Sequence, residues 1–173
     1  MRTTKSGSGG EILAQRNETT QAKRGLPALS DVLIVEDENF DANRLQATLH
    51  LVLGRETNVR RAASLGAAID SVIQMLPDMV FLDDYLKPSD TATDTIPFLR
   101  RAGYNGPIIV ISGEVDRARR VELRSAGASD AIHKDDLDSA KVAEALIRAF
   151  GKSSAANQSK TAATGTGAGT KAG

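Results

Sequence analysis

The chain has 173 residues, in which 22 Lys and Arg balance 22 Asp and Glu, and it contains no Cys and no Trp. The lack of Cys excludes a disulfide scaffold and every thiolate metal site. No apolar run approaches the ~20 residues that a membrane span needs, and the N-terminus lacks the apolar segment of a secretory signal. We therefore expect a cytoplasmic protein with no membrane partner.

The neutral total hides an uneven distribution of charge. Both ends of the chain are basic, and residues 31–151 hold 20 acidic against 14 basic side chains. Residues 152–173 contain no large apolar residue, so they cannot bury enough surface to offset the entropy of ordering. We predict a flexible basic extension over 1–28, a folded domain over 29–151 and a disordered tail over 152–173. An acidic domain argues against nucleic acid as its ligand.

The first half of the folded domain predicts two pairs of a strand and a helix. Asp31–Val35 is a continuous apolar run, typical of a strand buried on both faces, and Thr57–Arg61 is a weaker strand. The first helix ends at Gly54, and its apolar face, at helical spacing, comprises Leu45, Leu49, Val52 and Leu53. The second runs from a Ser64 cap to Pro77, with an apolar face of Ile69, Val72, Ile73 and Leu76.

The second half predicts three further strands and three further helices. In chain order these are a strand over Met79–Leu82, a loop over Lys87–Asp94, a helix around Ile96–Ala102, a strand over Pro107–Ile111, a helix over Arg117–Ala126, a strand over Ala128–His133 and a helix over Lys141–Phe150. Strict alternation makes each helix the crossover between two parallel strands. The expected fold is therefore α/β, a doubly wound, flavodoxin-like (βα)5 sandwich with a five-stranded parallel sheet.

Polar side chains stand where four of these strands end. They are Glu36 and Asp37, Asp83 and Asp84, Ser112, and Lys134. The carboxyl ends of parallel strands meet at one edge of the sheet, so these groups converge there. Clustered carboxylates repel unless a cation lies among them, and oxygen ligands in this number suit Mg²⁺ that shares its shell with a phosphoryl group. An ammonium and a hydroxyl suit phosphoryl oxygens, and one central carboxylate suits a nucleophile that forms an acyl phosphate.

This constellation resembles the receiver domain of two-component response regulators, over about residues 31–151. The resemblance rests on Val32-Leu-Ile-Val-Glu36-Asp37-Glu38, Asp78-Met-Val-Phe-Leu-Asp83, Pro107-Ile-Ile-Val-Ile-Ser112 and Gly127-Ala-Ser-Asp-Ala-Ile-His-Lys134. It implies a CheY-like, stand-alone regulator that takes a phosphoryl group from a sensor histidine kinase or a histidine phosphotransferase with Mg²⁺. It also implies an output by protein binding or onward phosphotransfer, compatibility with a weak homodimer, and no enzyme activity beyond the regulator's own phosphorylation and dephosphorylation.

The resemblance also implies a role for each residue at the strand ends. Asp83 is the phosphoacceptor and a metal ligand, Lys134 holds a phosphoryl oxygen, and Ser112 turns toward the phosphoryl group. The metal ligands it implies are Asp37 directly, Glu36 through water, and the backbone carbonyl of Tyr85. Two departures stand out, because the family usually has an aromatic residue where this chain has Ala131 and a Pro where it has Asp135.

Several alternatives stay open at this point. The spacing from Asp78 and to Leu86 favours Asp83 as phosphoacceptor, whereas Pro88 stands one position late and favours Asp84, which is otherwise a solvated loop acid. A second interpretation is a pseudo-receiver that binds partners without phosphorylation. A third is a phosphatase with an aspartyl nucleophile, although such enzymes need Asp-x-Asp after the first strand and this chain has Glu36-Asp37-Glu38.

Overall fold

The structure, a computed structural model, describes residues 25–161, with side chains as far as residue 151. Residues 1–24 of the extension predicted over 1–28 lie outside the described residues. The elements in chain order are β1 (Asp31–Val35), α2 (Asn39–Leu53), β2 (Asn58–Ala62), α3 (Leu65–Gln74), β3 (Met79–Asp83), β4 (Tyr85–Leu86), β5 (Asp90–Thr91), α4 (Ala92–Arg101), β6 (Ile108–Ser112), α5 (Arg117–Ala126), β7 (Asp130–His133), the 3-10 turn η1 (Lys134–Asp136) and α6 (Ser139–Thr161).

Five of the strands form one parallel sheet in the order β2-β1-β3-β6-β7. This confirms the doubly wound, flavodoxin-like fold. The chain moves from β1 outward to β2 and then crosses back to β3 on the other side, so the strand order reverses between β1 and β3. In open α/β sheets such a reversal leaves a crevice at the carboxyl ends of the two strands. The register pairs Val35 with Leu82 there, which brings Glu36, Asp37 and Asp83 to one place.

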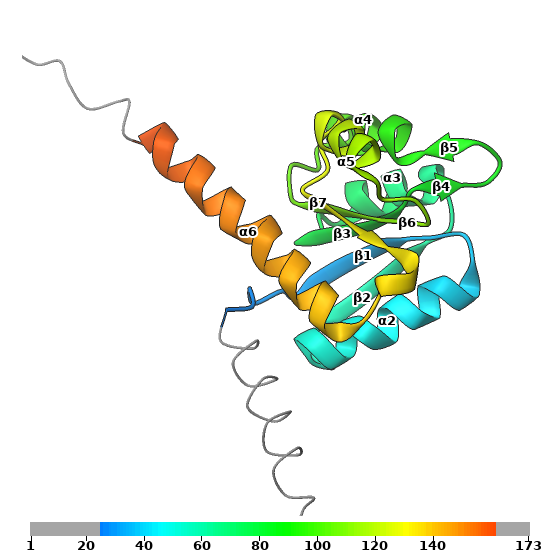
Figure 1. Cartoon of the computed structure of the whole chain (residues 1–173), viewed down its shortest axis with the longest axis horizontal. Coiled ribbons are helices and arrows are strands. Elements are labelled where there is room, and N and C mark those ends of the chain that lie inside the picture. Colours follow the sequence, from blue (N-terminus) through cyan, green and yellow to red (C-terminus); the bar gives the residue numbers. More distant parts are fainter. Residues whose placement is uncertain (1–24, 162–173) are drawn as a thin grey trace, which may run out of the picture.

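Helices cover both faces of the sheet, with α2 and α6 on one and α3, α4 and α5 on the other (Figure 1). Because side chains alternate along a strand, β1 sends Val32 and Ile34 to the first face and Leu33 and Val35 to the second. All four are buried. Burial on both faces is why this strand is a continuous apolar run in the sequence.

The apolar face predicted for the helix after Ser64 is partly wrong. Ser64 does cap α3, with its hydroxyl accepting from the Ala67 amide at 3.2 Å, and Val72 is buried. Ile73 and Leu76, however, are 68% and 59% exposed. The helix ends at Gln74, before Leu76, where the Arg60 guanidinium donates hydrogen bonds to the carbonyls of Ser71 and Met75. These bonds satisfy carbonyls that a helix end leaves free.

Two other segments differ from the sequence expectations. The loop predicted over Lys87–Asp94 contains β5, which pairs antiparallel with β4 just before the loop, and α4 begins at Ala92 behind a Thr91 cap. At the other end, α6 continues to Thr161, so the boundary predicted at residue 151 lies inside a helix that extends past the sheet (Figure 1). Extending a helix that is already packed needs no new nucleus. The rest of the predicted tail, 162–173, lies outside the described residues.

The helices of the described segment, 25–161, include none that combines the length and the apolar character needed to cross a membrane.

Candidate functional site

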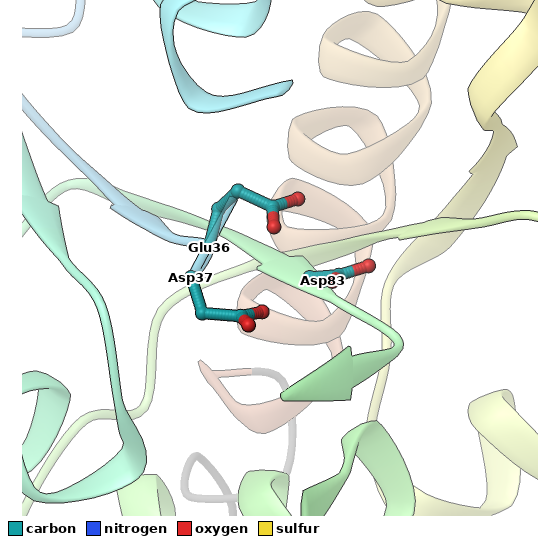
Figure 2. A group of neighbouring side chains, drawn as sticks. All are labelled: Glu36, Asp37 and Asp83. Atoms are coloured by element: carbon teal, nitrogen blue, oxygen red, sulfur yellow. The ribbon is translucent and has the colours of Figure 1, made fainter. Parts of the chain in front are cut away.

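Three carboxylates meet at the reversal of strand order. Glu36 and Asp37 directly follow β1, and Asp83 is the last residue of β3. Each offers an oxygen within 4.8 Å of an oxygen of the other two, and Figure 2 shows the three groups extending to the same side of the strand ends. Glu36 and Asp83 are each only 6% exposed. The structure thus brings together three of the residues that the sequence places at strand ends.

Lys134, at the end of β7, supplies the positive charge of this cluster. Its Nζ lies 3.0 Å from Asp83 Oδ1, 3.0 Å from Asp41 Oδ2 and 3.5 Å from Glu36 Oε2. Asp41, in the first turn of α2, is a member of this cluster that no strand end predicts. A single acid there carries no distinctive local pattern, because its contact with Lys134 depends on how α2 packs against β1 and α6.

Burial sets the protonation of the cluster. Desolvation raises the pKa of Glu36 to about 7, against the opposing hydrogen bond from the Glu38 amide at 2.9 Å. Desolvation also raises the pKa of Asp83, although its hydrogen bond with Lys134 opposes this. Burial lowers the pKa of Lys134, but its contacts with Asp41 and Asp83 outweigh that effect, so the net direction is upward and the ammonium stays charged.

This donor set fits a magnesium ion. Glu36, Asp37 and Asp83 provide carboxylate oxygens close enough to share one ion, and oxygen ligands are the ones Mg²⁺ takes in proteins. Burial raises the pKa of Glu36 and of Asp83 despite the nearby ammonium, and a bound cation would favour the ionised form of both carboxyls. The carbonyl of Tyr85 stays a prediction as a ligand. The exposed Tyr85 ring is held by its hydroxyl, which donates to the Pro88 carbonyl at 2.8 Å.

A second ammonium approaches the site from the β4–β5 hairpin. Lys87 Nζ lies 3.7 Å from Asp37 Oδ2 and also contacts the carboxylate of Glu38. The lysine side chain is 66% exposed, so we assign it little stabilising energy. Sequence reasoning missed this contact, because the residues are fifty or so positions apart and the loop carries no motif.

Ser112 and Asp84 form a separate cluster beside the first. The Ser112 hydroxyl lies 2.7 Å from Asp84 Oδ2, and Asp84 is also bound by the guanidinium of Arg119 on α5. The Asp84 side chain is only 14% exposed. The interpretation of Asp84 as a solvated loop acid is therefore wrong. The reason is tertiary, since an ion pair with Arg119 compensates the carboxylate that β3 carries into a half-buried position.

The two neighbouring acids thus occupy different environments. Asp83 lies with Glu36, Asp37 and Lys134, whereas Asp84 lies with Ser112 and Arg119. Ser112 is 3% exposed, and the hydrogen bonds described for its hydroxyl go to Asp84 and to the backbone of Glu114. Of the six predicted site residues, the structure groups the side chains of four: Glu36, Asp37, Asp83 and Lys134. Ser112 instead contacts Asp84, the residue after Asp83.

Comparison with known proteins agrees with this geometry. The family model of the response regulator receiver domain matches residues 32–147. No curated protein sequence matches the chain. Among solved structures, a putative response regulator from Chloroflexus aurantiacus is 26% identical, with a TM-score of 0.56 over 68% of this chain and 98% of that one.

Two further structures share the fold at lower identity. NtrX from Brucella abortus is 23% identical with a TM-score of 0.67, and the match covers 83% of this chain and 32% of that longer one. The receiver domain of the histidine kinase CKI1 from Arabidopsis thaliana, solved with Mg²⁺ and BeF₃⁻, is 17% identical with a TM-score of 0.61, covering 77% and 97%. With the family match over most of its folded part, the chain belongs to the response regulator receiver domain family.

Proposed function

We propose that Asp83 accepts a phosphoryl group from the phosphohistidine of a sensor histidine kinase or a histidine phosphotransferase, with Mg²⁺ as cofactor. One observation carries the proposal: the Asp83 carboxylate lies 3.0 Å from the Lys134 ammonium inside a cluster of three carboxylates. A nucleophile, a fixed cation and a set of metal ligands are the parts that phosphoryl transfer to a carboxylate needs.

The proposed step is an in-line displacement. A carboxylate oxygen of Asp83 forms a bond to phosphorus, the bond between phosphorus and the imidazole nitrogen breaks, and its electron pair stays on that nitrogen. Lys134, whose Nζ lies 3.0 Å from Asp83 Oδ1, favours the ionised, nucleophilic form of Asp83. Glu36, Asp37 and Asp83 would hold the metal, which supplies positive charge against the added phosphoryl oxygens.

The CKI1 receiver structure supports this proposal, because it contains Mg²⁺ and BeF₃⁻ on the same fold. We propose in addition that the phosphorylated form acts by binding another protein or by passing the phosphoryl group onward, and that it has no enzyme activity beyond its own phosphorylation and dephosphorylation. The alternative is a pseudo-receiver, a protein-interaction module that binds its partner independently of phosphorylation.

Intact-protein mass spectrometry after incubation with Mg²⁺ and acetyl phosphate separates the two. We expect the wild type to gain one phosphoryl group, Asp83→Asn to gain none, and the matched control Asp84→Asn to gain one. A chelator should abolish the gain. If neither the wild type nor Asp84→Asn is modified, the phosphoacceptor function is refuted and the pseudo-receiver is favoured.

A further inference from the structure

Ser112, Asp84 and Arg119 form a continuous chain of contacts from the end of β6 to α5. Ser112 Oγ lies 2.7 Å from Asp84 Oδ2. Arg119 donates through Nε to the same oxygen at 3.1 Å and through a second nitrogen to Asp84 Oδ1, so its guanidinium binds the carboxylate in a bidentate manner. A bidentate pair of this kind fixes the orientation of the carboxylate as well as its charge.

Arg119 lies in the first turn of α5, where it contacts neighbouring residues of the helix and its cap. Its amide donates at 2.7 Å to Asp116 Oδ1, the cap of the helix, and its outer nitrogen lies 2.6 Å from Glu122 Oε2. The side chains of Asp84 and Arg119 are 14% and 20% exposed, so the pair is only weakly screened by water. A displacement of the Asp84 carboxylate therefore acts on the first turn of this helix.

The Ser112 hydroxyl has one proton and can donate it to one acceptor at a time. In this structure the charged acceptor within reach is Asp84, the residue next to Asp83 along the chain. Asp83 ends β3 opposite Ile111, the residue before Ser112 on β6, so a phosphoryl group on Asp83 would introduce a second charged acceptor near the same hydroxyl. Asp84, the phosphoryl group and the Glu114 carbonyl, which lies 2.9 Å from the hydroxyl oxygen, then compete for one proton.

We infer that Asp84 and Arg119 are positioning residues that hold Ser112 in the unphosphorylated protein. When Ser112 donates to a phosphoryl oxygen instead, Asp84 loses one of its partners and is left with Arg119 alone, and the change reaches α5 through that ion pair. This inference rests on the proposed function, since it needs a phosphoryl group on Asp83. It adds a route by which occupancy of the site is communicated to α5.

The test uses beryllofluoride with Mg²⁺ as the probe, on the full chain. Bound probe is measured by fluorine NMR, and the Arg119 side-chain Nε–H signal by nitrogen–proton NMR. Four proteins form a double-mutant cycle: wild type, Asp84→Ala, Ser112→Ala and the double variant. Because a hydrogen bond to a charged acceptor must break in the wild type alone, we expect Asp84→Ala to bind the probe about tenfold more tightly.

The cycle separates the hydroxyl from simple charge effects. Removing Asp84 also removes a negative charge near Asp83, and that contribution persists without Ser112. We expect the tightening to be much smaller in the Ser112→Ala background, and the probe to shift the Arg119 signal in the wild type. Glu122→Gln, which removes only the charge of the outer partner of Arg119, is the matched control and should bind the probe as the wild type does.

Two results overturn the inference while leaving the proposed function intact. One is equal tightening with and without Ser112, and the other is probe binding that leaves the Arg119 signal unmoved. A wild type that binds no probe refutes the proposed function and this inference together. If Asp84→Ala does not fold, Asp84→Asn replaces it, with a smaller tightening that must again depend on Ser112.

Discussion

Replacing Glu36 by Gln is expected to stabilise the metal-free protein above neutral pH. Burial raises the pKa of Glu36 from 4.5 to about 7. The unfolded chain therefore loses this proton at a lower pH than the folded protein does. The stabilising contribution is complete below pH 4.5 and is lost as the pH rises through about 7. Gln carries no charge to bury, and its amide oxygen can still accept the Glu38 amide.

The gap between the two pKa values sets the size of the effect. From 4.5 to about 7, at about 1.4 kcal/mol for each pKa unit, the ionised carboxylate costs about 3 kcal/mol of unfolding free energy above the folded pKa. Just above the unfolded pKa the cost is below about 1 kcal/mol, because only a small part of the titration is complete.

Urea unfolding with a chelator, at about pH 5 and about pH 8, measures this difference. Glu36→Gln should exceed the wild type by about 3 kcal/mol at the higher pH and by less than about 1 kcal/mol at the lower one. Glu56→Gln, at an exposed position, is the control and should change the free energy of unfolding little at either pH. The reasoning is refuted if Glu36→Gln gains equally at both pH values, or loses stability at the higher one.

Three further predictions test other parts of the account. Mg²⁺ should raise the thermal midpoint of the wild type and much less that of Asp37→Asn, and equal rises would contradict the ligand assignment. Lys134→Met leaves the carboxylates of Glu36, Asp41 and Asp83 without their ammonium. Urea unfolding at about pH 8 should therefore show a loss of about 3 kcal/mol in the free energy of unfolding, and the loss should shrink toward about pH 5. A loss independent of pH would contradict the charge cluster. Leu146→Ala empties a fully buried core position and should cost about 3 kcal/mol, while the folded fraction is phosphorylated at the wild-type rate; a slower rate would couple this core to the site.

The strands were predictable from sequence because burial on both faces leaves a local trace. Asp31–Val35 is recovered with the same bounds, and the other four central strands within two residues at each end. The helix over Arg117–Ala126 also has the predicted bounds, since Gly127 takes the left-handed conformation that ends it. The inner face of α3 was not predictable, because Ala68 packs inward while Ile73, a larger residue, faces solvent.

The candidate site shows the same division. Strand ends are visible in the sequence, and the topology of a doubly wound sheet brings Glu36, Asp37 and Asp83 together. The partners that decide their charge are not visible, since the Asp41 contact with Lys134 spans 93 positions along the chain. Arg119 meets Asp84 across 35 positions. Such pairs depend on how helices pack against the sheet, which no local pattern encodes.

The most direct test of the central claim is to locate the acyl phosphate. After incubation with Mg²⁺ and acetyl phosphate, borohydride reduces an aspartyl phosphate to homoserine, which peptide mass spectrometry assigns to one position. The account predicts homoserine at position 83, dependent on Mg²⁺ and absent from Asp83→Asn. Homoserine at Asp84 or at any other acid, or no conversion of the wild type, would contradict it.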